Sequence, residues 1–316
     1  MDFRTIIKPE PGHRGLIGYE RGPVVALGSC FSDTISRRLR DDLFEVVANP
    51  TGTLYNPRSI ASTVERIVSG RPYEAHELFL TPSGRWSALS HHSSFSDEDP
   101  HRLLDTMNCS LARAHETLRR ASVLFVTLGS AYTYELDGET VANCHKLPAR
   151  IFRRTLMETD EVVFTLRKIA DLVPEARVVA TVSPIRHLAD GLHVNNVSKA
   201  TLMLGVEKSE VDYFPAYEAV VDDLRDYRFY AADMKHPSEL AADYVYDLFC
   251  ETYMDAATLA VREDCRRLTR LVSHRPADPA AHLRLVGEAA DSLAKKYPFL
   301  SDNINTYLND NGLRCK

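Results

Sequence analysis

Two short segments carry side chains of the types that nucleophilic enzymes use. Gly28-Ser29-Cys30 places a hydroxyl and a thiol beside a turn-forming glycine, and Asp233 stands three residues before His236. A carboxylate at that spacing can accept a hydrogen bond from the histidine Nδ1, which leaves Nε2 to face a nucleophile. If the fold joins the two segments, Cys30 or Ser29 forms a catalytic triad with His236 and Asp233.

Each segment also has a purely structural interpretation. A cysteine is most often a small buried hydrophobic residue, and Gly28 would then serve only to turn the chain. An isolated Asp-x-x-His sequence is typical of a solvated turn. The choice therefore depends on the elements that carry Cys30 and His236.

Short apolar runs rich in Val, Phe and Thr predict the buried strands of a parallel sheet. They occupy residues 23–27, 44–48, 123–128, 177–182 and 228–231. Helical spacing of apolar residues predicts helices at 31–43, 59–68, 103–119, 155–172 and 209–227. This alternation predicts an α/β fold with a three-layer, doubly wound, flavodoxin-like sheet of about five parallel strands.

A sheet of this kind binds ligands beyond the carboxyl ends of its strands. Cys30 follows the first predicted strand, at a strand-to-helix turn where free N–H groups and the helix dipole lower a thiol pKa. Asp233 and His236 follow the last predicted strand. We therefore expect the thiol and the Asp-x-x-His segment to meet at one edge of the sheet.

We expect an α/β domain over residues 1–255 and a C-terminal helical extension over 256–316, because no strand pattern returns after residue 241. The connection over about residues 50–120 is long, and loops of this length often cap an active site, so a lid is expected there. Its Trp86, His91 and His92 would line a pocket or pack within the lid. Adjacent histidines lack metal-ligand spacing, so no metal is expected.

The composition narrows the class of protein. The 316 residues are 44% hydrophobic and 26% charged, as in ordinary globular proteins, and the net charge of -6 argues against a nucleic-acid partner. No run reaches the ~20 apolar residues of a membrane span, and the first residues lack a secretory signal. We therefore expect a cytoplasmic protein. Its thiols are expected to be free, because its six cysteines form no CxxC pair.

Three motifs together strongly resemble the GSCFA family. They are Gly-Ser-Cys-Phe-Ser at 28–32, Asn-Pro-Thr-Gly-Thr-Leu-Tyr-Asn-Pro at 49–57 and the Asp-x-x-His at 233–236. Similar stretches at 127–135, 141–148, 181–187, 195–200 and 224–238 extend the resemblance over about residues 20–250. The GSCFA family looks like a branch of the SGNH/GDSL-like hydrolases. The resemblance thus implies acyl-ester chemistry on an SGNH-hydrolase-like fold.

The resemblance also implies roles for single residues. Cys30 takes the nucleophile position, with His236 and Asp233 completing the site, and Gly52 and Gly129 fall in the turns that supply oxyanion donors. Ala131, however, stands where the superfamily has an oxyanion asparagine. Loss of such a donor typically costs ~2.7–4 kcal/mol in the barrier, so an active enzyme needs a substitute.

Three polar residues are candidates for that substitute: Asn56, Asn143 and His145. Each has an alternative, because Asn56 before a proline can shape a turn, and Asn143 and His145 can satisfy backbone groups in a loop.

Four basic or titratable side chains are expected to surround the mouth of the site: Lys146, Arg186, His187 and Lys199. Positive charge there suits a substrate or acyl donor that carries carboxylate or phosphate, coenzyme A included. An ordinary set of surface ion pairs is the alternative.

Three functions remain open from sequence. The first is an esterase, thioesterase or O-acyltransferase that acts on a small-molecule or carbohydrate ester through Cys30, with no cofactor beyond an acyl donor such as acyl-CoA. The second keeps the fold but uses Ser29 as nucleophile. The third is a degenerate protein that binds a carbohydrate or acyl ligand without turnover. The sequence does not predict the oligomeric state.

Overall fold

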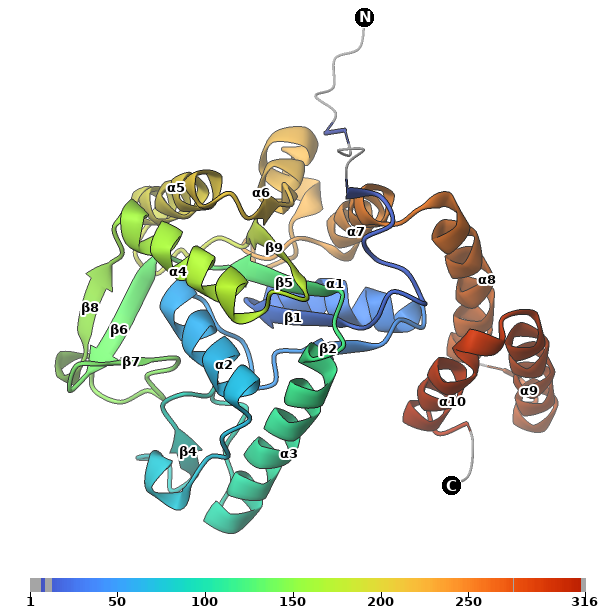
Figure 1. The fold of residues 1–316 in the computed structure, drawn as a ribbon, viewed down its shortest axis with the longest axis horizontal. Helices are drawn as coiled ribbons and strands as arrows, with labels where there is room; N and C mark the ends of the chain where they lie inside the picture. The colour runs from blue at the N-terminus through green and yellow to red at the C-terminus, as the bar shows by residue number, and fades with distance from the viewer. Residues whose placement is uncertain (1–6, 9–12, 275, 314–316) are drawn as a thin grey trace, which may run out of the picture.

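A five-stranded parallel sheet forms the centre of the protein in a computed structural model that describes residues 7–8, 13–274 and 276–313 (Figure 1). Its strands are β1 (Val24–Gly28), β2 (Val46–Ala48), β5 (Val123–Leu128), β9 (Arg177–Val182) and β10 (Asp212–Tyr213). The order is β10-β9-β5-β1-β2, which is 2-1-3-4-5 when the strands are counted along the chain. This confirms the predicted doubly wound, flavodoxin-like sheet.

Helices cover both faces of the sheet and make two hydrophobic cores. One face carries α2 (Pro57–Ser69), α3 (Pro100–Leu118), α4 (Thr159–Leu172) and α5 (Leu192–Ser209). The other carries α1 (Cys30–Asp41), α6 (Ala216–Glu218) with its π-helical continuation Ala219–Leu224, and α7 (Glu239–Tyr253). Successive strand residues point to opposite faces, so Val25 and Leu27 join the first core while Val24 and Ala26 join the second.

The fifth strand differs from the prediction. Residues 228–231 do not form a strand; a 3-10 helix (Tyr227–Phe229) occupies this segment, and Asp226 caps it by accepting a hydrogen bond from the N–H of Arg228. The last strand of the sheet is β10, which hydrogen-bonds to β9. A two-residue strand is too short to leave a hydrophobic pattern in the sequence.

The helix predicted at 209–227 also differs from the structure, and the helix that precedes this segment was not predicted. The long helix α5 ends at Ser209, before β10, and only the short helix α6 with its π-helical turn follows β10. Large apolar side chains of α5 are exposed at Leu192 and Leu204 as well as buried at Leu202. Apolar residues spread around the helix hide the one-sided periodicity that sequence reading depends on.

Residues 50–120 do not form a single lid. Helices α2 and α3 from this segment pack on the sheet, and the hairpin β3 (Leu78–Leu80) and β4 (Trp86–Ala88) lies between them in sequence. A separate antiparallel sheet of β6 (Tyr132–Leu136), β7 (Glu139–Val141) and β8 (Arg153–Leu156) is inserted after β5. Positive φ angles at Asp137 and Gly138 fit the tight turn between β6 and β7.

The predicted C-terminal helices are present as α8 (Ala256–Ser273), α9 (Pro279–Lys296) and α10 (Ser301–Asp310). They enclose a third core and lie to one side of the sheet (Figure 1). Their attachment includes the buried carboxylate of Asp42, which accepts hydrogen bonds from Arg262 Nε at 2.5 Å and the Tyr246 hydroxyl at 2.8 Å. None of the helices that the structure describes is both long and apolar enough to cross a bilayer.

Candidate active site

The structure brings Cys30, His236 and Asp233 together. Cys30 Sγ lies 3.6 Å from His236 Nε2, and His236 Nδ1 lies 2.6 Å from Asp233 Oδ2. These distances place the thiol at one end of the imidazole and the carboxylate at the other. The order of groups is that of a nucleophile, a base and the residue that orients the base.

Asp233 is held in an ionised form. Its Oδ1 accepts hydrogen bonds from the backbone N–H groups of Lys235 at 2.9 Å and His236 at 3.1 Å. These bonds, with the imidazole contact, hold the pKa of the Asp233 carboxyl well below its usual range. An ionised Asp233 favours the His236 tautomer with its proton on Nδ1, which leaves Nε2 as the acceptor that faces Cys30 Sγ.

Cys30 is the first residue of α1, and its position depends on Ser29. Ser29 is the buried N-cap of the helix, and its Oγ accepts a hydrogen bond from the N–H of Phe31 at 3.3 Å. Ser29 therefore caps the helix, and Cys30 alone of the two lines the cavity beside His236. The geometry favours the thiol over the hydroxyl as nucleophile.

The resting thiol is not activated by the helix terminus alone. Burial raises the pKa of Cys30, and the backbone N–H groups of Cys30 and Phe31 only partly oppose this effect. The expected net lowering is therefore not found, because the desolvation of the thiol outweighs the dipole of α1. A base is needed to remove the proton, and His236 is in position to act as one.

A cavity of about 530 Å³ lies over these residues. Its walls come from the ends of β1 and β5, the inserted β6–β8 sheet and the segment between β9 and α5, including Cys30, Tyr55, Asn56, Ser130, Tyr132, Asn143, Arg154, Arg186, His187, Asn195 and His236. A larger hollow of about 990 Å³ lies at Ser122 and Arg177, where β5 and β9 begin. We place the candidate site at the smaller cavity, because it is lined by both Cys30 and His236.

This cavity lies where a doubly wound sheet is expected to bind ligands, beside the reversal of strand order between β1 and β5. A model of the GSCFA family matches residues 23–249, which span the whole sheet and include Cys30, Asp233 and His236. The chain belongs to the GSCFA family. No curated protein matches it. The match ends within α7, so α8, α9 and α10 lie outside the GSCFA region.

The backbone amides of the two glycines expected to supply oxyanion donors already have hydrogen-bond acceptors in this GSCFA chain. The N–H of Gly52 donates to the carbonyl oxygen of Asn49 at 2.7 Å, and the N–H of Gly129 donates to that of Tyr55 at 2.8 Å. Both amides are therefore occupied, that of Gly52 within its own turn and that of Gly129 by the segment that precedes α2. Gly52 is required for another reason: its φ is +78°, and a Cβ would lie 2.4 Å from the Cβ of His92.

Of the three candidate substitutes, Asn56 is the best placed. It is the N-cap of α2, its Oδ1 accepts a hydrogen bond from the N–H of Ser59 at 2.9 Å, and it lines the cavity. Among the described residues no partner is found for its NH2 group, so this group remains a donor. Asn143 also lines the cavity, with its Oδ1 accepting the N–H of His145 at 2.8 Å.

His145 has a structural role instead. It is buried between the hydroxyl of Ser87, 3.0 Å from its Nδ1, and the carbonyl oxygen of Ala88, 2.9 Å from its Nε2. It does not line the cavity. His91 is also buried, against Tyr73, and burial lowers its pKa to about 3. Neither these histidines nor Trp86 or His92 contribute to the cavity wall.

The expected ring of positive charge is present only in part. Arg186 lines the cavity and donates a hydrogen bond to the Tyr230 hydroxyl at 2.9 Å. His187 also lines it, but burial lowers the His187 pKa to about 4, so this imidazole is neutral. Lys146 is exposed elsewhere, and Lys199 is buried and does not reach the cavity wall.

Several wall residues were not predicted from sequence. Arg154 of β8 stacks on the ring of Tyr132 in β6, with its guanidinium carbon 3.7 Å from the ring centre. Asn195 of α5 accepts a hydrogen bond from the N–H of His187 at 3.0 Å and so shapes the loop after β9. Tyr132 and Asn195 fall within stretches that resemble the family, and this resemblance could have indicated them as site residues. Arg154 has no such signal.

Proposed function

We propose that this GSCFA protein is an acyl-ester enzyme that works through a covalent acyl-cysteine at Cys30. The observation that carries the proposal is the continuous contact from Cys30 Sγ through His236 to Asp233, at 3.6 and 2.6 Å. The same arrangement at the end of β1 is what an SGNH/GDSL-like hydrolase with a thiol nucleophile would have. The cavity above it provides space for a small-molecule or carbohydrate ester.

In the first half of the reaction, His236 Nε2 removes the thiol proton as Sγ attacks the carbonyl carbon of the ester or thioester. The carbonyl oxygen becomes an oxyanion. The bond to the leaving oxygen or sulfur then breaks, and His236 returns the proton to that atom. The product is a thioester on Cys30, while Asp233 stabilises the transient imidazolium.

In the second half, His236 removes a proton from water or from an acceptor hydroxyl, and that oxygen attacks the thioester carbon. The carbon–sulfur bond breaks and Sγ takes the proton back from His236. Water as acceptor gives hydrolysis, and a substrate hydroxyl gives O-acyl transfer, with an acyl donor such as acyl-CoA as the first substrate. No other cofactor is needed for either route.

Two groups can stabilise the oxyanion. The N–H of Cys30 lies at the first position of α1, where backbone amides have no partner within the helix. The NH2 group of Asn56 is the second donor, from the N-terminus of α2. Arg186 at the cavity wall favours substrates that carry a carboxylate or phosphate.

A second candidate function is binding without turnover. Ala131 takes the place of the superfamily's oxyanion asparagine, and the amides of Gly52 and Gly129 are occupied. If Asn56 does not replace them, the cavity would hold an acyl or carbohydrate ligand without activating it.

Trapping of the acyl-enzyme separates these functions. The protein is mixed briefly with p-nitrophenyl acetate or acetyl-CoA, quenched with acid, and digested for peptide mass mapping. We expect one acetyl group on Cys30, its absence in Cys30→Ala, and its retention in Ser29→Ala. Cys144→Ala is the matched control, because Cys144 is a half-buried thiol in the wall of the same cavity.

Acetyl on Ser29 would establish the hydroxyl as nucleophile. Equal labelling of Cys30 and Cys144, unchanged in His236→Ala, would show nonspecific acylation and contradict the proposal. Absence of acylation and of turnover with either donor would favour the binding function.

A further inference from the structure

The contact between Cys30 and His236 is set by two helices. Cys30 begins α1, and His236 lies in the turn just before α7, which Ser238 caps by accepting a hydrogen bond from the N–H of Ala241 at 3.3 Å. The two catalytic residues are 206 positions apart in sequence. Their alignment therefore depends on how α1 packs against the first turn of α7.

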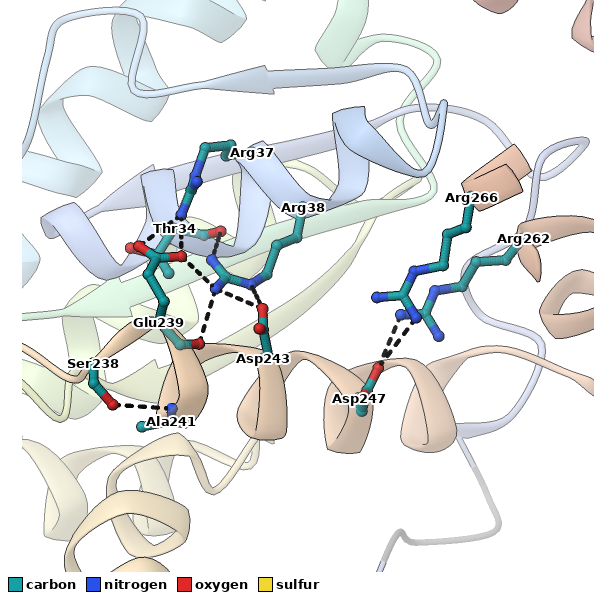
Figure 2. Close-up of polar contacts among 10 residues, drawn as sticks. All are labelled: Thr34, Arg37, Arg38, Ser238, Glu239, Ala241, Asp243, Asp247, Arg262 and Arg266. Carbon is teal, nitrogen blue, oxygen red and sulfur yellow. Dashed lines mark hydrogen bonds and ion pairs between the residues drawn. The ribbon is translucent and has the colours of Figure 1, made fainter. Parts of the chain in front are cut away.

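Arg38 joins these two helices at that place (Figure 2). Its side chain is only 8% exposed, although its partners Glu239 and Asp243 are on the surface of α7. The Nη2 group donates to Glu239 Oε2 at 2.9 Å and to the backbone oxygen of Glu239 at 3.2 Å. The Nε group donates to Asp243 Oδ1 at 2.8 Å.

Arg38 is also fixed on its own helix. Its Nη1 group donates to the backbone oxygen of Thr34, one turn closer to Cys30, at 3.3 Å. The neighbouring Arg37 reinforces the contact, with Nη2 donating to Glu239 Oε2 at 2.8 Å. Figure 2 shows both guanidinium groups directed from α1 toward the start of α7.

Apolar packing alone would not hold this register. Ile35 and Leu39 of α1 and Phe249 of α7 belong to one core, but hydrophobic contact is non-directional and tolerates small shifts between helices. A guanidinium group presents its donors in a rigid planar fork, which fixes both distance and direction. Glu239, which Arg38 holds through side chain and backbone, is three residues from His236.

We propose that Arg38 is a positioning residue that holds the first turn of α7 against α1 and so keeps His236 in reach of the Cys30 thiol. This inference rests on the proposed function of the Cys30–His236 pair. Arg38 does not line the cavity and touches no substrate, so its effect passes through Glu239 and the turn that carries His236.

A second arginine contact lies at the C-terminal end of α1, and it serves as the control. Arg262 of α8 is also almost buried, with a side chain 9% exposed, and it binds Asp42 after α1 and Asp247 of α7. Asp247 lies eight residues beyond Glu239, or about 12 Å along the helix at 1.5 Å per residue. Figure 2 shows this contact well separated from that of Arg38.

The test measures the rate of Cys30 alkylation by iodoacetamide against pH, which needs no substrate. It compares wild type, His236→Ala, Arg38→Gln, Glu239→Ala and Arg262→Gln, with thermal unfolding of each as a check of folding. Glu239→Ala keeps the test available if Arg38→Gln fails to fold, because the Glu239 side chain is 75% exposed.

We expect the Arg38→Gln and Glu239→Ala profiles to move toward that of His236→Ala, with alkylation at neutral pH about tenfold slower, as when a reacting pair loses its alignment. Arg262→Gln should keep the wild-type profile even if its unfolding temperature falls. If Arg38→Gln and Glu239→Ala keep the wild-type profile, or if Arg262→Gln shifts the profile equally, the positioning role is wrong and the proposed function stands. If His236→Ala does not alter the profile, the Cys30–His236 pair and the role of Arg38 both fail.

Discussion

Lys199 donates a hydrogen bond of 2.7 Å to the carbonyl oxygen of Gly129, and its Nζ group also lies 2.7 Å from the carbonyl oxygen of Ser183. The two acceptors directly follow β5 and β9, so this buried amino group joins the carboxyl ends of the two strands. In addition, Ser198, the preceding residue of α5, accepts a hydrogen bond from the N–H of Ala131 at 2.8 Å. Helix α5 thus fixes the turn that forms one wall of the cavity.

Burial of Lys199 should make the stability of the protein depend on pH. Burial lowers its pKa from 10.5 to about 7, so between these values the unfolded chain binds more protons than the folded chain. The contribution of Lys199 to the free energy of unfolding must then rise from about pH 7 to about pH 10.5. Urea unfolding of wild type and Lys199→Met across this range should give a difference that grows with pH in favour of the wild type. Parallel curves would contradict the prediction.

Asp233→Asn should preserve the fold and remove most of the activity. The amide cannot supply the negative charge that holds the His236 proton on Nδ1 and stabilises the imidazolium, a change that costs up to about 10⁴-fold in kcat in a serine-protease triad. The measurement is kcat for an ester substrate together with the circular dichroism spectrum. An active Asp233→Asn enzyme would show that His236 does not need an ionised partner.

Asn56→Asp separates the two uses of Asn56. Aspartate retains an oxygen acceptor for the N–H of Ser59 and is a favourable N-cap, so the stability of α2 should be nearly unchanged. It lacks the NH2 group, so kcat should fall by about 10²–10³-fold if this group binds the oxyanion. Asn143→Asp is the control from the same cavity, and we expect a smaller effect. An equal loss in both variants would point to the added negative charge as its cause.

Asp42→Ala should strongly destabilise the protein. The Asp42 side chain is 2% exposed and binds Arg262 and Arg266 of α8, so its removal leaves buried positive charge without a partner. Loss of one member of a buried ion pair costs about 3–5 kcal/mol of unfolding free energy. Urea unfolding measures the loss, and the double variant Asp42→Leu with Arg262→Met should recover much of it. No recovery would mean that the contacts of Asp42 with Arg266 and Tyr246 carry the stabilisation.

The sequence alone determined much of the framework. The strands β5 and β9 have the predicted bounds, because their mostly apolar residues are buried at nearly every position. The positions of α1 and α3 were predicted to within a few residues, because each buries one face at helical spacing and has a side-chain N-cap. The same local patterns placed Cys30 at a strand-to-helix turn.

The tertiary structure alone decided how the site is completed. Asp233 and His236 were expected after a strand, yet they reach the sheet edge through a turn closed by the pairing of Tyr230 with Pro237. Sequence motifs also could not show that the amides of Gly52 and Gly129 are occupied, that Lys199 is buried, or that Arg38 binds Glu239. Local patterns record the preferences of neighbouring residues, whereas burial and hydrogen-bond occupancy depend on segments that meet only when the whole chain has folded.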